Sequence, residues 1–566
     1  MQHLSAPDRI SRLLFPLLCI AAFAYVFSYA WVTEDAYITF RVVDNAVHGF
    51  GLRWNIDERV QVYTHPLWML IHIPFYAVFD NIFLLTIALS AVFGVAAVAL
   101  LIKTVPARNW HRCLLVLLPL TLSKTFDSYV ICGLETPLTF CTLAAFFYTL
   151  ARTPQRIYPL LFFASLGVLT RFDNLIPLLP ALLWLGIRHA RNIRIRPLLA
   201  ATLPLTGWCA FALFYYGFVF PNTKYAKLNT GIHLASYIMQ GRHYLQNFFH
   251  YDLFAFVWIS VAVITGLTRL PSLFKPLQNR APLAPLLALG ITASVTYVVM
   301  VGGDFMAGRF FAMPFFLSVI LLYDVFRELS YIFLGRLLLA ASAVCLIESS
   351  ITAPEYRDSA NVYANYGIVE ERRFYQDSNA LFIRGTLRFR GGPSHLFAQW
   401  GEGMRANRRS RLVQVFGNVG MYGYYAGPRF RIIDSLALAD PLLARLPVIN
   451  IHNWRIGHFE RRIPPGYVWA RMTGDTSRMP PNIRDYYDKL RLVISGNLFS
   501  LERLKTILGF QFGAYSMIKT DVKNANSYYM PLWNILSGMA DGRRSWSCGE
   551  NNNWDLPAIA CNIQCH

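Results

Sequence analysis

The sequence is poor in charged residues. Asp, Glu, Lys and Arg make up only 15% of its 566 residues, whereas soluble domains carry about 25%. Two long stretches, residues 82–102 and 199–215, contain no charged residue. Hydrophobic residues make up 55% of the chain, and the mean hydropathy is +0.37. This composition excludes a soluble globular protein of this size and predicts an integral membrane protein.

Motifs of nucleotide and metal sites are also missing. The sequence has no GxGxxG or GK[ST] pattern, no internal repeat, and no metal-ligand spacing among its nine cysteines. The net charge is +20. Because the composition is that of a membrane protein, we assign this charge to the loops between membrane helices and exclude a nucleic-acid partner. Cys548, Cys561 and Cys565 cluster in a polar tail. There we expect Cys548 to pair with Cys561 or Cys565 if the tail faces an oxidising compartment.

Apolar segments recur along the first 349 residues and predict about eleven membrane helices. The first is expected to be a retained helix, because it lacks a small-residue cleavage site. A further apolar segment at 67–79 is short and bounded by proline, which favours an interfacial helix. The predicted spans are 10–32, 82–102, 112–123, 136–151, 157–169, 174–187, 197–216, 253–266, 281–301, 310–325 and 331–349.

The charges of the loops predict the topology. With the N-terminus inside, every predicted cytoplasmic loop is basic, as the positive-inside rule requires. The basic residues of these loops are Lys103, Arg108, Arg112, Arg152, Arg156, Arg188, Arg191, Arg194, Arg196, Arg269, Lys275, Arg280, Arg327 and Arg336. The carboxylates collect in the opposite loops, which predicts chemistry on the outer side of the cytoplasmic (inner) membrane, facing the periplasm.

The chain is expected to have two domains. Residues 1–349 form a transmembrane domain with an acidic first outer loop at 33–66. Hydropathy then falls, and residues 350–566 form one soluble extracytoplasmic domain. Strand-like runs at 412–416 and 429–433 and a helix-like run at 498–508 indicate that this domain is α+β.

The first outer loop begins with the paired carboxylates Glu34 and Asp35. Such a pair at the membrane surface can accept a proton from a hydroxyl group; the alternative is a solvated helix end. Aromatic faces stack on sugars, and arginine binds phosphate through two nitrogens. The nearby residues of these kinds favour a sugar or phosphate site; they are Tyr37, Arg41, Trp54, Tyr63, His65 and Trp68.

Other outer loops repeat this combination of carboxylates, cations and amides. The residues are Glu135, Arg171, Asp173, Asn222, Lys224, Lys227, Asp304 and Arg309. We expect the five outer loops to converge on one face. The pairs Arg171–Asp173 and Asp304–Arg309 could instead be structural ion pairs. The glycines before Asp304 are expected to allow a tight turn.

Several segments resemble one family when they are taken in order. They are EDAYITFRVVDNAVHGFGLRWN, ERVQVYTHPLW, GLET, LTRFDN, YYGFVFPNTKYAK, GGDFMAGRFF, GNVGMYGYYAGPRFRIIDSLALADPLLARLP and RIGHFERRIPPGYV. They resemble the polytopic GT-C glycosyltransferases, and most of all the mycobacterial terminal β-(1→2) arabinofuranosyltransferases, which use decaprenyl-phosphoryl arabinofuranose. The resemblance covers nearly the whole chain.

The resemblance implies that Asp35 matches the catalytic carboxylate after the first span, with Glu34 beside it. Glu-Asp stands where many relatives have two aspartates, so either carboxylate could be the base. His65 and Phe172 stand where relatives have asparagine and proline. The expected phosphate-binding cations are Lys224, Arg309, Arg171 and Arg41. The expected sugar- and acceptor-binding residues are His65, Tyr63, Trp68, Glu135, Asp173, Asn222 and Asp304.

The predicted function is a membrane glycosyltransferase of cell-envelope biogenesis. It would move a pentofuranose, D-arabinofuranose, from a polyprenyl-phosphate donor in the membrane lipid to an outer glycan or glycoconjugate. A single displacement is favoured over a covalent intermediate with retention. No cofactor is expected, and no divalent metal is assigned. One alternative is a GT-C transferase for another lipid-linked sugar, acting on lipopolysaccharide, lipid A or a pilin-like protein. The alternative of another class is a solute transporter or lipid flippase, although these place ionisable residues near the bilayer midplane.

Overall fold

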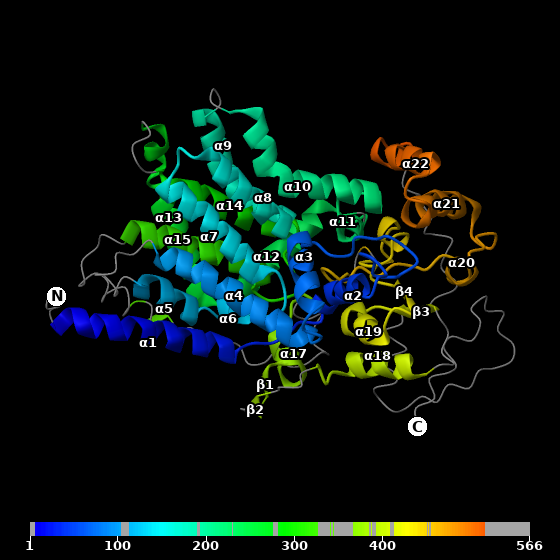
Figure 1. Ribbon diagram of the computed structural model, residues 1–566, viewed down its shortest axis with the longest axis horizontal. Coiled ribbons are helices and arrows are strands. Elements are labelled where there is room, and N and C mark those ends of the chain that lie inside the picture. The colour runs from blue at the N-terminus through cyan, green and yellow to red at the C-terminus, as the bar shows by residue number, and fades with distance from the viewer. Residues whose placement is uncertain are drawn as a thin grey trace. The chain divides into compact units, whose positions relative to one another are not determined.

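The computed structural model describes residues 6–103, 113–189, 193–228, 230–275, 281–326, 340, 343–344, 366–383, 386–387, 392–407, 413–449, 451 and 454–515. Within these ranges the chain is mostly helical (Figure 1). Its contacts divide it into two compact units. The first unit comprises Met1–Thr33, His65–Trp208 and His233–Pro393, and the second comprises Glu34–Thr64, Cys209–Ile232 and Ser394–His566.

The predicted apolar segments are helices, apart from the last one at 331–349, which lies almost entirely outside the described residues. The segment at 67–79 is also helical, as α3 (Pro66–Tyr76); its place at the membrane surface stays a prediction. The helices of the predicted spans are α1 (Ala6–Ser28), α4 (Ile82–Ile102), α5 (Leu114–Leu122), α7 (Thr136–Arg152), α8 (Ile157–Thr170), α9 (Leu175–His189), α10 (Ile195–Tyr216), α13 (Leu253–Leu267), α14 (Leu283–Met300) and α15 (Ala312–Phe326).

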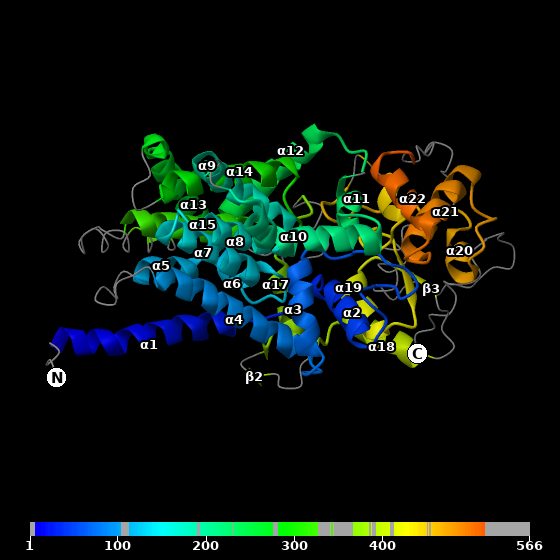
Figure 2. The same cartoon turned by 45° about the horizontal axis from the view of Figure 1, so that its top comes forward.

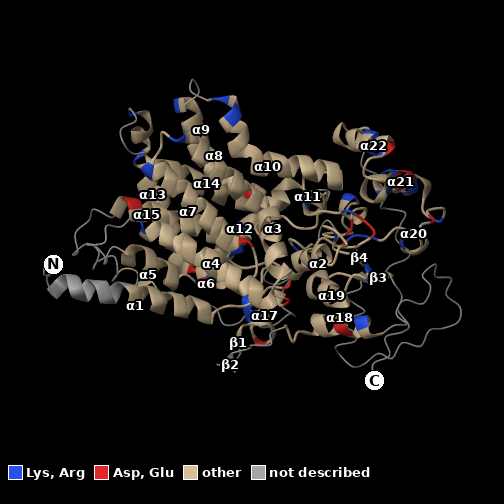
Figure 3. Ribbon diagram, viewed as in Figure 1, with Lys and Arg blue, Asp and Glu red and all other residues tan. Residues whose placement is uncertain are grey.

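Several of these helices are long and apolar enough to cross a membrane. Among the described residues there are four, Ile82–Ile102, Ile195–Tyr216, Leu283–Met300 and Arg309–Phe326. There are five if α12 (Leu234–Tyr251) and α13, bent by 111° relative to each other, form one broken span. Figure 3 shows these helices almost without charge along their length, with Lys and Arg at the ends of α9 and α10. The structure is therefore consistent with a polytopic membrane protein, and the count of eleven spans stays a prediction.

Glycines let the helices of the first unit approach closely. On α13, a Cβ at Gly266 would collide with Ala288 and with the carbonyl of Ala284 on α14. On α14, a Cβ at Gly290 would collide with the carbonyl of Pro177 on α9. Helix α14 packs against both α9 and α13, and the three helices lie close together in Figure 2. Small residues at helix interfaces are typical of membrane bundles, because they allow extensive van der Waals contact between backbones.

The segment after residue 365 begins within the first unit. It forms α17 (Glu371–Asn379) and the antiparallel pair β1 (Phe382–Ile383) and β2 (Thr386–Leu387). Single bridges join Val369 to Met306 and Ala380 to Trp31. Whether residues 350–566 form one domain outside the membrane stays a prediction.

The second unit contains a small β-α-β arrangement. Strands β3 (Val413–Phe416) and β4 (Arg431–Asp434) pair in parallel, which confirms the two predicted strand-like runs. The connection between them includes α19 (Val419–Ala426), and both α18 (Leu396–Ala406) and α2 (Ala36–Val47) pack on α19.

The remaining helices of this unit are short. The predicted helix at 498–508 is α22 (Leu501–Gln511), which begins three residues later than expected. The second unit thus combines helices with a small parallel sheet, and the α+β class of the predicted soluble domain stays a prediction. These helices are α11 (Asn222–Leu228), α20 (Tyr467–Thr473), α21 (Pro481–Ser495) and α22 (Leu501–Gln511). The predicted cysteine pairing at 548–565 lies outside the described residues.

Candidate functional site

A cluster of charged residues lies at the helix ends of the first unit. Glu135 is the residue before α7, and Arg171 is the residue between α8 and the 3-10 turn η2 (Phe172–Asn174). His65 precedes α3. Arg309 begins the 3-10 turn η5 (Arg309–Phe311), which leads into α15. Helix termini place these polar side chains at the ends of apolar helices rather than along them.

The loop between α14 and η5 brings Arg309 and Asp304 into this cluster. Gly302 and Gly303 have φ angles of +85° and +71°, in the left-handed region that glycine adopts without strain. Gly303 also lacks room for a side chain, because a Cβ would collide with the ring of Tyr244. The tight turn predicted from these glycines is therefore confirmed.

Glu135 is the centre of the cluster. Its carboxylate is 2.7 Å from Nη1 of Arg171 and 3.0 Å from Nδ1 of His65, and Nη2 of Arg309 lies 4.0 Å away. Its side chain is only 1% exposed. Burial by itself raises the pKa of Glu135, but the electrostatic effects of the His65 ring and the Arg171 guanidinium outweigh burial and hold the pKa well below its usual range.

Two further carboxylates complete the network. Asp173 accepts two parallel hydrogen bonds from Arg171, of 2.8 Å from Nε and 2.6 Å from Nη2. Asp304 lies 3.4 Å from Nη1 of Arg309. Both ion pairs considered from the sequence are therefore present, and Glu135 joins them into one network. Arg171 is held by short contacts on two sides, whereas the contacts of Arg309 are longer.

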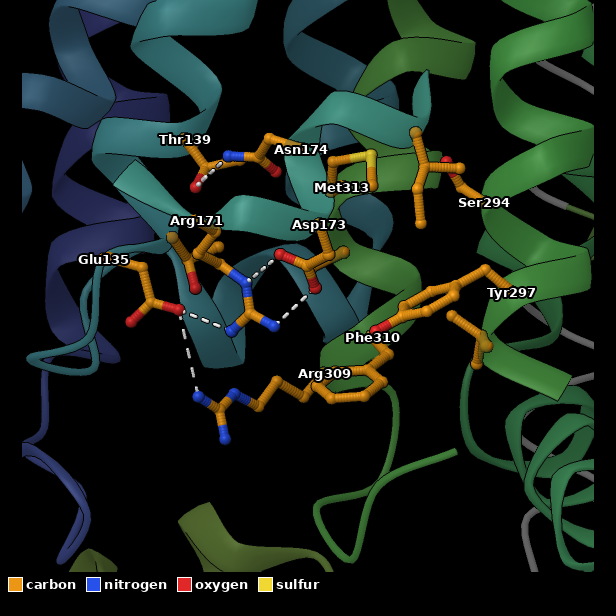
Figure 4. A pocket seen from close by; sticks show the side chains of 14 residues that line it. Glu135, Thr139, Arg171, Asp173, Asn174, Ser294, Tyr297, Arg309, Phe310 and Met313 are labelled. Carbon is orange, nitrogen blue, oxygen red and sulfur yellow. Dashed lines mark hydrogen bonds and ion pairs between the residues drawn. The ribbon is translucent and has the colours of Figure 1, made fainter. Parts of the chain in front are cut away.

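An open pocket adjoins this network (Figure 4). The space between its walls, including the part that is open to solvent, is about 530 Å³. Glu135, Arg171, Asp173 and Arg309 line one side, and Tyr297 and Phe310 supply aromatic rings. The guanidinium of Arg171 lies 5.4 Å from the centre of the Phe310 ring. A pocket with charged and aromatic walls can hold an anionic group together with a sugar ring.

Glu34 and Asp35 lie in the second unit, where the chain enters α2. Oε1 of Glu34 accepts hydrogen bonds from the backbone N–H groups of Gly420 (2.6 Å) and Met421 (3.2 Å), in the first turn of α19. Gly420 must be a glycine for this approach, because a Cβ there would collide with the Glu34 carbonyl. Glu34 therefore fixes the start of α2 to α19.

Burial distinguishes the two adjacent carboxylates. Burial, with a smaller effect from the charge of Asp35, raises the pKa of Glu34 to about 8, against the opposing effect of the two N–H groups. Glu34 is 7% exposed, whereas Asp35 is only half-buried. Of the two, Asp35 is the more accessible to a ligand.

Several predicted site residues have contacts that favour a structural role. The Arg41 guanidinium is buried over the Trp54 ring and donates to the carbonyls of Trp54, Gly423 and Phe430. The Asn222 amide donates to the carbonyls of residues 437, 438 and 440. The Tyr63 hydroxyl is 2.7 Å from that of Tyr216.

Two more of the predicted site residues, Trp68 and Lys224, lie in different units. Trp68, in the first unit, is buried and donates from Nε1 to the Gly133 carbonyl. Lys224, in the second unit, is exposed, with Nζ 3.3 Å from the centre of the Phe220 ring. The structure thus brings together the predicted residues His65, Glu135, Arg171, Asp173, Asp304 and Arg309. It places Glu34, Asp35, Arg41, Tyr63, Asn222 and Lys224 in the other unit, so that the convergence of all five loops stays a prediction.

Sequence reasoning did not identify Tyr297 and Phe310 as pocket residues. Tyr297 lies within an apolar helix, where an aromatic residue is usually part of the packing, so no local signal marked it. Phe310 directly follows Arg309, and its neighbour could have drawn attention to it. Among the described residues, no three His, Cys, Asp or Glu side chains are grouped as a metal site would require.

Comparison with known proteins identifies relatives of this chain. The sequence matches no protein-family model. A protein of Mycobacterium tuberculosis named terminal β-(1→2)-arabinofuranosyltransferase is 24% identical, over 83% of this chain and 88% of the relative. A Corynebacterium glutamicum protein of the same name is 26% identical, over 76% of this chain and 72% of the relative. The family resemblance predicted from the motifs is thereby confirmed, and the chain is a distant homologue of the terminal β-(1→2)-arabinofuranosyltransferases.

Proposed function

We propose that this protein is a glycosyltransferase that moves D-arabinofuranose from a polyprenyl-phosphate donor to an envelope glycan or glycoconjugate, on the outer side of the cytoplasmic membrane. The observation that carries the proposal is the similarity, over most of the chain, to two proteins named as arabinofuranosyltransferases. The apolar helices support a membrane location, where a polyprenyl chain remains dissolved in lipid. This similarity does not favour the transporter alternative.

In the first unit, we assign the donor phosphate to the pocket beside Arg309. Negative charge grows on the phosphate as its bond to the sugar breaks, and a fixed cation stabilises that charge. Arg171 is already bound at short distance by Asp173 and Glu135, so its role is to hold the pocket wall. The contacts of Arg309 with Asp304 and Glu135, at 3.4 and 4.0 Å, are long enough for a phosphate to compete with them.

In the second unit, we assign the base to Asp35. The acceptor hydroxyl oxygen forms a bond to the anomeric carbon, the bond from that carbon to the phosphate oxygen breaks, and the hydroxyl proton passes to the Asp35 carboxylate. Glu34 is unsuited to this role, because its buried carboxyl keeps a proton near neutral pH and Oε1 is engaged by two N–H groups. Arg41 and Asn222 are left out of the proposed site, because backbone carbonyls occupy their donors.

The test is sugar transfer in detergent from polyprenyl-phosphoryl D-arabinofuranose to an arabinofuranosyl acceptor. Asp35→Asn keeps the shape of the side chain but cannot take a proton, so we expect turnover to fall about 100- to 10,000-fold with donor binding retained. Glu34→Gln keeps an oxygen that accepts both hydrogen bonds, so we expect a loss of less than about tenfold. Full activity in Asp35→Asn, or an inactive Glu34→Gln, would refute the assignment of the base.

Donor recognition is tested separately. Arg309→Ala should raise KM for the donor as well as lower kcat, whereas Arg405→Ala, at an exposed position on α18, should change neither. The sugar is tested by offering polyprenyl-phosphate donors that carry other pentoses or hexoses. If another sugar is transferred faster, that sugar is the substrate in place of arabinofuranose, and the protein is still a glycosyltransferase. Absence of transfer from every lipid-linked donor, by a protein that is folded and inserted, would remove the proposal.

A further inference from the structure

Helix α22 of the second unit is attached to the end of α10. Nη2 of Arg503, on α22, donates to the carbonyls of Phe214 (2.8 Å) and Tyr215 (3.0 Å) in the last turn of α10. Nε2 of Gln511 donates to the Gly217 carbonyl at 3.0 Å. In Figures 1 and 2, α22 lies beside this end of α10. Three carbonyls at and just after the end of a candidate membrane span are thus bound by α22.

Helix α22 buries polar side chains and exposes apolar ones along one of its sides. Its buried residues are Arg503, Thr506 and Ile507, two of which are polar. Leu501 (66% exposed) and Leu508 (52% exposed) lie outward, and the other exposed residues of α22 are Glu502, Lys505 and Gln511. A water-exposed helix buries its apolar side chains and exposes its polar ones. The outward face of α22 is therefore suited to an apolar environment.

We call the exposed apolar residues of this segment the α22 face; they are Phe499, Leu501, Leu508 and Phe512. Positions 501, 505, 508 and 512 follow one another at intervals of three and four residues, so they share one side of the helix. Phe499 and Phe512, at its two ends, are 79% and 85% exposed. Lys505, the one charged residue at these helical positions, is also exposed.

We propose that the α22 face lies in the headgroup region of the lipid bilayer, at the point where α10 leaves the membrane. α10 is apolar and long enough to span a bilayer, and its last residues are those that α22 binds. A helix fixed at the end of a span is held at the depth of the membrane interface. Helices at that depth bury an apolar side in the acyl boundary and direct lysine toward the headgroups. The inference concerns the membrane contact alone and does not depend on which sugar is transferred.

The test is photo-crosslinking of the full-length protein in lipid vesicles. p-Benzoylphenylalanine replaces Phe512, where the exposed side chain leaves room for the larger group. A second protein carries it in place of Phe499. The control carries it in place of Leu396, which is 56% exposed at the start of α18 in the same unit. After irradiation, mass spectrometry identifies what is attached to each position.

We expect phospholipid adducts at positions 499 and 512, at least about tenfold more abundant than at position 396. Adducts should form in phosphatidylcholine vesicles as well as in vesicles that contain phosphatidylglycerol, because apolar contact is the main attraction. Equal yields at all three positions, or no lipid adduct at 499 and 512, would overturn the inference. Crosslinks from these positions to residues 516–566, or to a second copy of the chain, would also overturn it, because the face would then be covered by protein.

Discussion

Glu135 is the residue whose replacement tests the charged network most directly. Glu135→Gln keeps the size of the side chain and removes its negative charge. The buried cluster would then lose the carboxylate that lies 2.7 Å from Arg171, 3.0 Å from Nδ1 of His65 and 4.0 Å from Arg309. Removing one partner of a buried ion pair typically costs about 3–5 kcal/mol, because the remaining charge is left without compensation. We therefore expect a clear loss of stability at neutral pH.

The loss should depend on pH in a defined direction. The pKa of Glu135 in the folded protein lies well below the ordinary value of 4.5. A carboxyl group with a lowered folded pKa stabilises the protein above its unfolded pKa, and this stabilisation is lost as the pH falls toward the folded value. As the pH falls below about 4.5, the difference in the free energy of unfolding between wild type and Glu135→Gln should therefore decrease by about 1.4 kcal/mol for each pH unit.

The measurement is thermal unfolding of both proteins in the same detergent at pH 7 and at pH 3.5. The control is Glu402→Gln, the same chemical change at an exposed position on α18. We expect it to change the free energy of unfolding by less than about 0.5 kcal/mol at either pH. A Glu135→Gln protein as stable as wild type at pH 7 would refute the network as a source of stability. A difference that grows in acid would contradict the lowered pKa.

Three further predictions concern other parts of the chain. Gly420→Ala should lower the free energy of unfolding by about 1–3 kcal/mol and also lower the rate of sugar transfer, because its Cβ collides with the Glu34 carbonyl. The control is Gly403→Ala, which has open space around it and should not lower the stability. Arg41→Lys should lower the free energy of unfolding by about 2–3 kcal/mol, because an ammonium group cannot donate to all three carbonyls in the same geometry. Arg405→Lys is the control for this substitution. A phosphatase fused after His566 should be active if the C-terminus faces outward, and an active cytoplasmic reporter there would contradict the topology.

The helices of the fold could be predicted from the sequence because hydrocarbon imposes a simple rule. A chain in lipid must satisfy its backbone hydrogen bonds within itself, so long apolar runs such as 82–102 and 283–300 become helices. The two strands at 413–416 and 431–434 were predictable for a related reason, since short runs rich in β-branched and aromatic residues favour strands. The assembly of the second unit was not predictable. Asn222 reaches carbonyls more than 200 positions away, and no local pattern signals such a contact.

Residue type alone could not separate structural from functional cations. Arg41 and Arg309 both follow a carboxylate in an outer-loop motif, and both were predicted to bind phosphate. In the structure Arg41 donates to three carbonyls and is 1% exposed. The side chain of Arg309 is 12% exposed and lines a pocket. Only the surroundings distinguish them, because each nitrogen of the buried Arg41 guanidinium already donates to a carbonyl, whereas Arg309 faces a pocket.

Glu34 and Gly420 illustrate why the base could not be assigned from the acidic pair itself. They are 386 positions apart, and each constrains the other: the carboxylate needs the N–H group of residue 420, and residue 420 can approach only without a side chain. Once Glu34 is bound in this way, its burial and hydrogen bonds favour a structural role, and we therefore propose Asp35 as the base. The distinction between two adjacent acids therefore comes from a distant glycine, which the sequence of the acidic loop does not contain.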